Sequence, residues 1–175
     1  MAKVKLGVKI RETGTGSLVD AVIEPVTLKD YKIIKQSTGR FNKFDWSLYK
    51  KKEVYKLRLK ANTTILGLMC LIDHTDPDTN AIEIALLEVS VENIGNNKQY
   101  DYIGGCLIAF ACRESFKRGH EGFVSLVPKS SLIEHYTQHY GFEYFPMQTP
   151  SRPCGLMVLY DHLARNLIMK YLSAS

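Results

Sequence analysis

The residues with the clearest potential for chemistry lie in the middle of the chain, in a turn that leads into a helix. The turn, residues 99–105, carries Gly104 and Gly105, and the predicted helix runs from Ile103 to about Lys117. Backbone N–H groups at a helix N-terminus and the helix dipole favour an anion, and glycines let a ligand approach the backbone closely. One interpretation is a binding site for a phosphate or pyrophosphate. The alternative is a tight turn without a ligand.

Two carboxylates precede this turn on a predicted strand, residues 81–91. They are Glu83 and Glu88. A carboxylate beside a reacting amine can act as a general base. The two positions differ in parity, so a regular strand places them on opposite faces. The alternative for each is a solvated or ion-paired strand carboxylate.

The elements around these residues predict a β-α-β unit, in which the helix is followed by a strand over residues 123–127. The helix is apolar all round from Cys106 to Cys112, which predicts that it is buried. Upstream, alternation over residues 3–11 predicts a half-buried strand that forms a hairpin with the next one. The other upstream expectations are a strand over 18–26, a helix over 28–36 capped by Thr27, a short helix or irregular flap over 41–52, and strands over 53–60 and 63–72.

Downstream, Ser131 and Glu134 fit a capping box, and the helix they begin carries an apolar stripe and ends at Gly141. Strands over 142–145 and 155–160, a loop over 146–154 and a helix over 162–172 complete the chain. The stripe consists of Leu132, Ile133, Tyr136 and Tyr140. The expected fold class is α/β (α+β), one domain with a mixed, mostly antiparallel sheet of about seven strands flanked by helices.

The composition is that of an ordinary globular protein, with 175 residues, 45% hydrophobic and 23% charged. The net charge of +5 is uneven, because residues 1–60 carry +9 and the remainder −4. No apolar run is long enough to cross a membrane, and the N-terminus does not resemble a signal peptide, so a cytoplasmic protein is expected. The four cysteines form no C-x-x-C pair, which favours free thiols. A polar loop, residues 73–80, holds three aspartates and a histidine, but its spacing favours a hairpin loop over a metal site.

In their order along the chain, three segments resemble motifs of the Gcn5-related N-acetyltransferase (GNAT) family. Gln99-x-x-Tyr102-x-Gly104 resembles the Gln/Arg-x-x-Gly-x-Gly/Ala pyrophosphate motif, residues 136–142 resemble the helix that ends in apolar-Gly-Phe, and residues 65–68 resemble the third strand. The element order matches from Leu18 to Tyr160. The resemblance therefore implies a single GNAT-like domain over 1–175, with an extra strand and turn over 1–17 and a C-terminal helix over 161–175. Tyr102 replaces the first motif glycine, and Thr137 stands where the family usually has a tyrosine.

The resemblance implies binding of acetyl-CoA and no metal. The backbone of the strand would hold the pantetheine arm and the acetyl carbonyl, and the motif would hold the pyrophosphate. Glu83 resembles the base of the histone-acetyltransferase branch, Glu88 is the second candidate, and Tyr136 is the candidate acid or, alternatively, a core aromatic. The strand positions are Leu87, Val89 and Val91, and the motif positions are Gln99, Tyr100, Asp101, Tyr102, Ile103, Gly104 and Gly105.

The leading functional prediction is an N-acetyltransferase in which an amine of a small molecule, peptide or protein attacks acetyl-CoA directly, without an acetyl-cysteine intermediate. A second hypothesis is a domain of this fold that binds an acyl-CoA or another ligand without turnover. A third is an RNA-associated acetyltransferase that uses the Lys-rich first strand and Lys50, Lys51 and Lys52.

Overall fold

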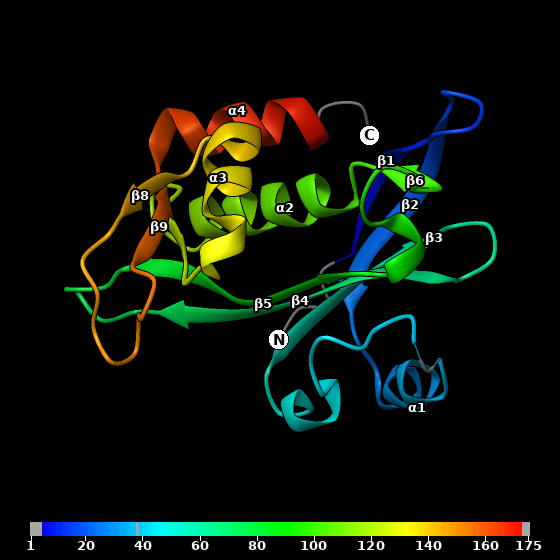
Figure 1. The fold of residues 1–175 in the computed structure, drawn as a ribbon, viewed down its shortest axis with the longest axis horizontal. Helices are drawn as coiled ribbons and strands as arrows, with labels where there is room; N and C mark the ends of the chain where they lie inside the picture. Colours follow the sequence, from blue (N-terminus) through cyan, green and yellow to red (C-terminus); the bar gives the residue numbers. More distant parts are fainter. Residues whose placement is uncertain (1–4, 38, 173–175) are drawn as a thin grey trace. The chain divides into compact units, whose positions relative to one another are not determined.

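The structure, a computed structural model, describes residues 5–37 and 39–172. The chain forms two compact units, each described below by itself. The first contains the described parts of 1–70 and 86–107, and the second contains 71–85 and the described part of 108–173. Strands β4 (Ile65–His74) and β5 (Ala81–Val89) and helix α2 (Ile103–Lys117) run from one unit into the other (Figure 1).

The first unit begins with the predicted hairpin, β1 (Leu6–Glu12) and β2 (Leu18–Pro25), which pair antiparallel. Lys3 and Val4, the first residues of the predicted strand, lie outside the described residues. Val8 and Ile10 are buried, as the alternation predicts. The third strand, β3 (Glu53–Leu59), pairs antiparallel with β2.

Helix α1 (Leu28–Gln36) has the predicted bounds and cap. Thr27 and Asp30 form a capping box, in which the Thr27 side chain accepts from the Asp30 amide and Asp30 Oδ2 accepts from the Thr27 amide. Lys56 also donates to Asp30 Oδ2 at 2.7 Å, and both side chains are buried. The predicted flap over 41–52 contains a short 3₁₀ turn, η1 (Trp46–Tyr49).

In the second unit, β7 (Val124–Leu126) pairs parallel with β5, which confirms the predicted β-α-β unit. Two further strands follow, β8 (Glu143–Phe145) and β9 (Leu156–Leu159); β9 pairs antiparallel with both β7 and β8. The hydrogen-bonded strand order is β6-β1-β2-β3-β4-β5-β7-β9-β8. The described residues thus form nine strands where about seven were predicted, and β6 (Tyr100–Asp101) is too short to leave a periodic signal.

The helical segments of the second unit are irregular. After a 3₁₀ turn, η3 (Ser130–Leu132), comes one α-helical turn, α3 (Ile133–His135), and then a π-helical turn, η4 (Tyr136–Tyr140), which ends at Gly141 with φ 79°. The predicted capping box of Ser131 and Glu134 is wrong, because Ser131 lies inside the 3₁₀ turn and no side chain caps α3. Helix α4 (Asp161–Leu172) follows β9.

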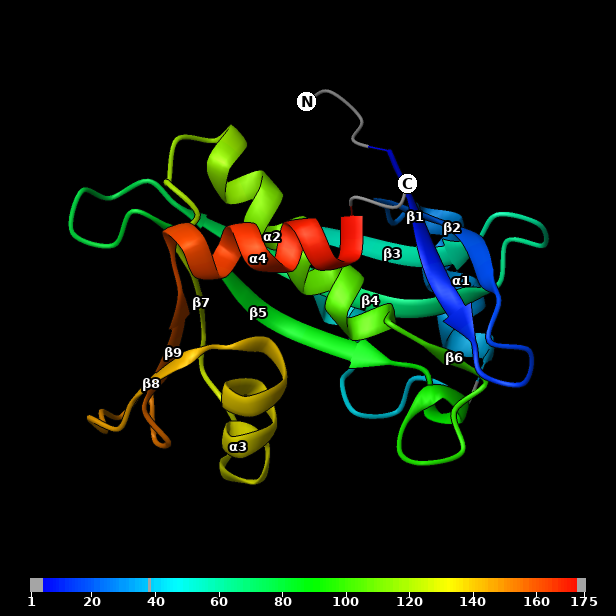
Figure 2. The same ribbon diagram turned by 90° about the horizontal axis from the view of Figure 1, so that it is seen from above.

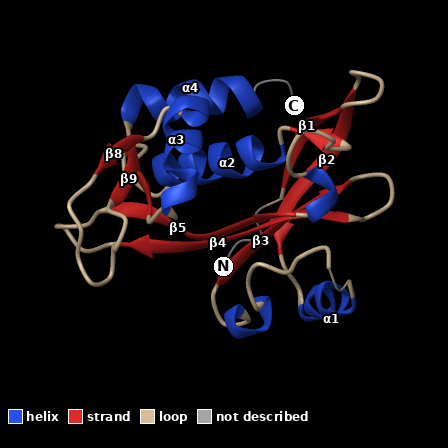
Figure 3. Cartoon of the chain, viewed as in Figure 1, coloured by secondary structure: helices blue, strands red, loops and turns tan. Residues whose placement is uncertain are grey.

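Within this unit, residues 108–117 of α2 and helices α3 and α4 lie on one side of β9 (Figures 1 to 3), and Figure 2 shows them on the same side of β7. Residues 106–112 of α2 are fully buried, which confirms that prediction, and so is Cys70. Burial raises the pKa of Cys106 to about 12 and also raises the pKa of Cys112. Among the described helices, none is both long enough and apolar enough to cross a membrane.

Candidate functional site

The predicted strand over 81–91 ends two residues early. Strand β5 ends at Val89, and Val91 begins a 3₁₀ turn, η2 (Val91–Asn93). The amide of Val91 donates to the carbonyl of Arg40 at 3.1 Å. Of the three strand positions assigned to a pantetheine arm, only Leu87 and Val89 are therefore in the strand.

A buried asparagine fixes the connection from β5 to the motif. Asn93 donates through Nδ2 to Ser90 Oγ at 2.9 Å and accepts the amide of Tyr100 on Oδ1 at 2.8 Å. Arg40 braces the same segment, since its Nη2 donates to the carbonyl of Ile65 at 2.9 Å and its Nε donates to Glu92 at 3.0 Å. Asn93 and Arg40 were not predicted as site residues from the sequence, because their partners are not neighbours in any periodic pattern.

The first part of the motif is a short strand rather than a turn. β6 pairs antiparallel with β1, with Glu12 opposite Tyr100 and Arg11 opposite Asp101. The amide of Gln99 donates to the carbonyl of Glu92. The N-terminal strand therefore fixes the beginning of the motif.

The amides available to an anion lie at the end of the motif. The amides of Tyr100 and Tyr102 donate to side chains, whereas Ile103, Gly104 and Gly105 form the first turn of α2. The first intrahelical bond runs from the Cys106 amide to the Tyr102 carbonyl at 2.9 Å. The amides of the three preceding residues have no acceptor within the helix, because no helical turn precedes them. Such amides at a helix N-terminus favour an anion.

Tyr102 adopts a left-handed conformation that is typical of glycine, with φ 78°. Tyr102 stands where the motif has its first glycine, and a left-handed conformation costs a residue with a Cβ about 1–2 kcal/mol. Contacts around the turn stabilise this conformation of Tyr102. Asp101 Oδ1 accepts the Tyr102 amide at 2.9 Å, and the Arg11 guanidinium lies 5.5 Å from the Tyr102 ring centre.

Arg11 also donates to Asp101 Oδ2 at 3.2 Å. Burial would raise the pKa of Asp101, but the hydrogen bonds from Tyr102 and Arg11 and the charge of Lys98 outweigh it and lower the pKa. Within the described residues, Nε of Arg11 is buried without a hydrogen-bond partner. The start of α2 therefore combines three amides that have no acceptor within the helix with the nearby guanidinium of Arg11. These groups fit a phosphate ligand.

Gly67 on β4 allows the start of α2 to pack closely. A Cβ at this position would lie 2.8 Å from Ile103 Cγ2 and 2.9 Å from Leu107 Cδ1. The apolar-Gly-apolar pattern over residues 65–68 thus has a packing reason. Gly67 sets the position of the helix N-terminus in the first unit.

Glu88 is fully buried and bonded on both oxygens. Trp46 Nε1 donates to Oε1 at 2.8 Å, and the amide of Lys43 donates to Oε2 at 2.9 Å. This carboxylate therefore anchors the segment around η1 to β5. The alternative predicted from the sequence, a solvated or ion-paired carboxylate, does not describe Glu88, which is buried and accepts from two neutral N–H groups.

Glu83 belongs to the second unit and is half-buried. Nε2 of His74 donates to Oε1 of Glu83 at 2.8 Å. Glu83 lines a cavity of about 570 Å³ together with residues of β7, β9 and the loop before β5. It is therefore accessible to a ligand in a way that Glu88 is not.

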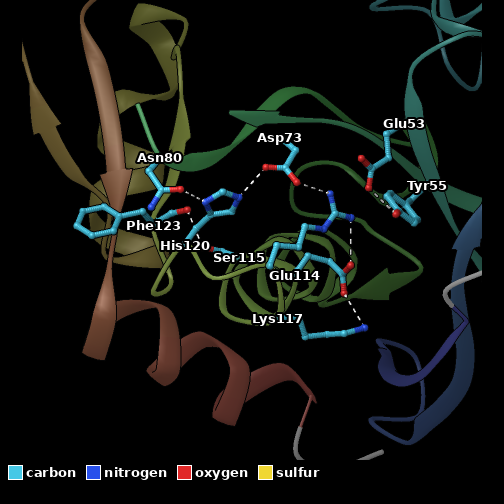
Figure 4. A network of polar contacts seen from close by, with 10 residues as sticks. Glu53, Tyr55, Asp73, Asn80, Glu114, Ser115, Lys117, His120 and Phe123 are labelled. Carbon is cyan, nitrogen blue, oxygen red and sulfur yellow. Dashed lines mark hydrogen bonds and ion pairs between the residues drawn. The ribbon is translucent and has the colours of Figure 1, made fainter. Parts of the chain in front are cut away.

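A buried histidine, His120, also lines this cavity. Figure 4 shows its polar contacts. His120 contacts Asp73 Oδ1 through Nε2 at 2.6 Å and Asn80 Oδ1 through Nδ1. Asp73 also accepts from Arg118 at 3.3 Å, and Arg118 donates to Glu114 of α2 at 3.1 Å. The network joins the end of α2 to the β4–β5 connection, and the sequence did not reveal it because Asp73 and His120 are far apart in the chain.

Tyr136 lies at the start of the π-helical turn in an aromatic cluster. Its ring lies 5.6 Å from that of Phe142 and 6.1 Å from that of Tyr140. Burial raises the pKa of Tyr136, so the phenol keeps its proton at neutral pH. Tyr136 is absent from the described lining of the cavity that contains Glu83. Both predicted roles, acid and core aromatic, remain compatible with this position.

Solved structures share this fold. The AtaTR complex bound with acetyl-CoA matches with a TM-score of 0.59 and 13% identity, over 85% of this chain and 98% of that one. Mycobacterium smegmatis RimJ in complex with CoA-disulfide matches with a TM-score of 0.58 and 11% identity, over 97% of both chains. The Bacillus subtilis N-acetyltransferase YlbP in complex with coenzyme A matches with a TM-score of 0.53 and 14% identity, over 87% and 96%.

The chain therefore has the fold of the Gcn5-related N-acetyltransferases, as the order of its motifs predicts. A scan against protein-family models finds no match, and a search of curated proteins finds none either.

Proposed function

We propose that this protein is an acetyl-CoA-dependent N-acetyltransferase that transfers the acetyl group to an amine by direct attack. The observation that carries the proposal is the start of α2. There Tyr102 takes the conformation of the missing glycine, with φ 78°, and presents a helix N-terminus beside Arg11. This geometry occurs in a fold whose solved neighbours include proteins bound to acetyl-CoA and coenzyme A.

In this proposal the amides of Ile103, Gly104 and Gly105 bind the pyrophosphate. Gln99, Tyr100 and Asp101 hold the motif against β1. The backbone of Leu87 and Val89 binds the pantetheine arm. Val91 contributes at most its carbonyl, because its amide already donates to Arg40.

The reaction joins the amine nitrogen to the carbonyl carbon of the thioester and breaks the C–S bond. The attacking nitrogen loses a proton to a base, and the leaving thiolate takes a proton from an acid. We assign the base to Glu83, since both oxygens of Glu88 are already bonded inside the protein. Tyr136 is the proposed acid, because its raised pKa keeps a proton available.

The experiment that tests this proposal measures CoA release from acetyl-CoA with a panel of amines. Glu83→Gln should lower the rate most at neutral pH and less at high pH, where the free amine is abundant. Cys154→Ala, which removes the half-exposed thiol, should leave the rate nearly unchanged. Binding of acetyl-CoA without CoA release for any amine would instead support a binding protein without turnover.

A second candidate function, association with RNA, is favoured by a lysine-rich surface of the first unit. Helix α1 and the segment around η1 lie together, because the Tyr31 hydroxyl donates to the Tyr49 carbonyl at 3.2 Å. Their exposed lysines are Lys29, Lys32, Lys35, Lys43, Lys50, Lys51 and Lys52. Such a surface suits a polyanion. Its affinity for RNA should fall steeply with salt, and salt-independent or undetectable RNA binding would reject this candidate.

A further inference from the structure

The floor of the cavity in the second unit is one face of the three neighbouring strands β5, β7 and β9. Its volume is about 570 Å³. The strand register places Glu83 of β5 opposite Ser125 of β7, and Ser125 opposite Val158 of β9, so these three side chains form one row. The alternate residues of β7 and β9, such as Val124 and Leu159, are fully buried. The row of Glu83 therefore faces away from that buried layer.

One side of the cavity is aromatic and exposed. The rings of Phe123 and Tyr160 stack with their centres 5.7 Å apart and their planes 23° apart. Phe123 is 40% exposed, and Phe145, which also lines the cavity, is 46% exposed. Large apolar side chains that remain exposed in a concave surface are typical of a binding site.

The charge of the cavity is predominantly negative. Three carboxylates line it, those of Asp78, Glu83 and Glu121, together with the guanidinium of Arg152 and the imidazoles of His74 and His120. Glu83 lies at the edge of the apolar floor and is held by His74 through Oε1. The described residues provide no hydrogen-bond partner for its second oxygen, Oε2. This combination favours a cation with an apolar body over an anion.

We propose that this cavity binds an organic amine, with the ammonium against Glu83 and an aromatic or apolar body against Phe123 and Tyr160. The amine is the acceptor of the proposed acetyl transfer, and in that respect the inference rests on the proposed function. It narrows the acceptor from any amine to amines with an apolar body. Binding of the amine is measurable without acetyl-CoA, so the two proposals fail separately.

The test compares three probes by calorimetry or ligand-observed NMR: 2-phenylethylamine, its neutral analogue 2-phenylethanol, and ethylamine. The parent protein should bind 2-phenylethylamine at least about ten-fold more tightly than either of the others. Glu83→Gln should remove the preference for the amine over the alcohol. Phe123→Ala should weaken both aromatic probes. Asp76→Asn, which removes an exposed charge of the neighbouring loop outside the cavity lining, is the matched control and should change neither affinity by more than about two-fold.

Three results would overturn the inference: no binding of 2-phenylethylamine, equal binding of the amine and the alcohol, or an undiminished amine preference in Glu83→Gln. A parallel titration with acetyl-CoA separates the two proposals. If the parent binds acetyl-CoA but not the amine, the cavity assignment is wrong and the proposed donor site stands. If it binds the amine but not acetyl-CoA, the proposed function fails and the cavity assignment stands. Thermal unfolding of each variant confirms that it is folded.

Discussion

Glu88→Gln distinguishes an anchoring carboxylate from a catalytic base. In the parent, the two oxygens of Glu88 accept from Trp46 Nε1 at 2.8 Å and from the Lys43 amide at 2.9 Å, and the side chain is 1% exposed. A glutamine has one oxygen, so one buried donor loses its acceptor and faces an amide NH₂ group. Hydrogen bonds to charged groups contribute about 1.5–3 kcal/mol, and an unsatisfied buried donor costs about 1–3 kcal/mol. We therefore expect a loss of about 2 kcal/mol in the free energy of unfolding, or about 4–8 °C in Tm for a chain of this length.

Thermal unfolding followed by circular dichroism measures this loss. The emission of Trp46, the only tryptophan, reports locally on the broken hydrogen bond. Glu83→Gln is the matched control, because it makes the same chemical change at a half-buried carboxylate that is bonded to His74, where we expect a loss of less than about 1 kcal/mol in the free energy of unfolding. If Glu88→Gln unfolds at the parent Tm with unchanged emission but loses activity at neutral pH, Glu88 is the base and its anchoring role is wrong.

Three further predictions concern packing, pH and thiols. Gly67→Ala should lower the unfolding free energy by about 1–3 kcal/mol through overpacking against α2, whereas Gly7→Ala, with open space around its Cβ, should lower it far less in the same urea titration. Burial works to raise the pKa of Asp30, but hydrogen bonds from Lys56 and the α1 cap outweigh it, so the folded-state pKa is lowered. The stabilisation that ionised Asp30 contributes is thus present above the unfolded-state pKa of about 3.9 and is lost as the pH falls through the folded-state pKa. Asp30→Asn should remove this part of the acid destabilisation, and identical profiles of unfolding free energy against pH for parent and variant would contradict the prediction. Thiol reagents should label the half-exposed Cys154 first and leave the buried cysteines unlabelled in native buffer; rapid labelling of those cysteines would refute their burial.

The parts of the fold that were predicted from the sequence are those with a local cause. Thr27 caps α1 through Asp30, three positions away, and α2 begins at the predicted residue, Ile103, at the start of an apolar run. The parallel pairing of β5 and β7 follows from the strand–helix–strand order. The capping box at Ser131 failed, since a matching spacing does not ensure that the backbone begins a helix there.

The parts of the site that were missed depend on contacts between distant residues. Tyr102 takes a positive φ because Asp101 and Arg11 support the turn, and Arg11 comes from the first strand. Likewise, Asn93 fixes the connection into β6 through a hydrogen bond to an amide seven residues later. His120 lies beside the cavity through Asp73 of β4. No periodicity or motif indicates such pairs.

The central claim is that acetyl-CoA binds with its pyrophosphate at the start of α2. Calorimetric titration of acetyl-CoA into the parent and into Gly104→Glu tests this claim most directly, because the glutamate places bulk and negative charge at the proposed pyrophosphate-binding site. Gly7→Glu adds the same charge on an exposed position of β1 and is the matched control. The account predicts binding to the parent and to Gly7→Glu, and a loss of at least about ten-fold for a folded Gly104→Glu. Equal affinity of all three proteins, or no binding to the parent, would contradict it.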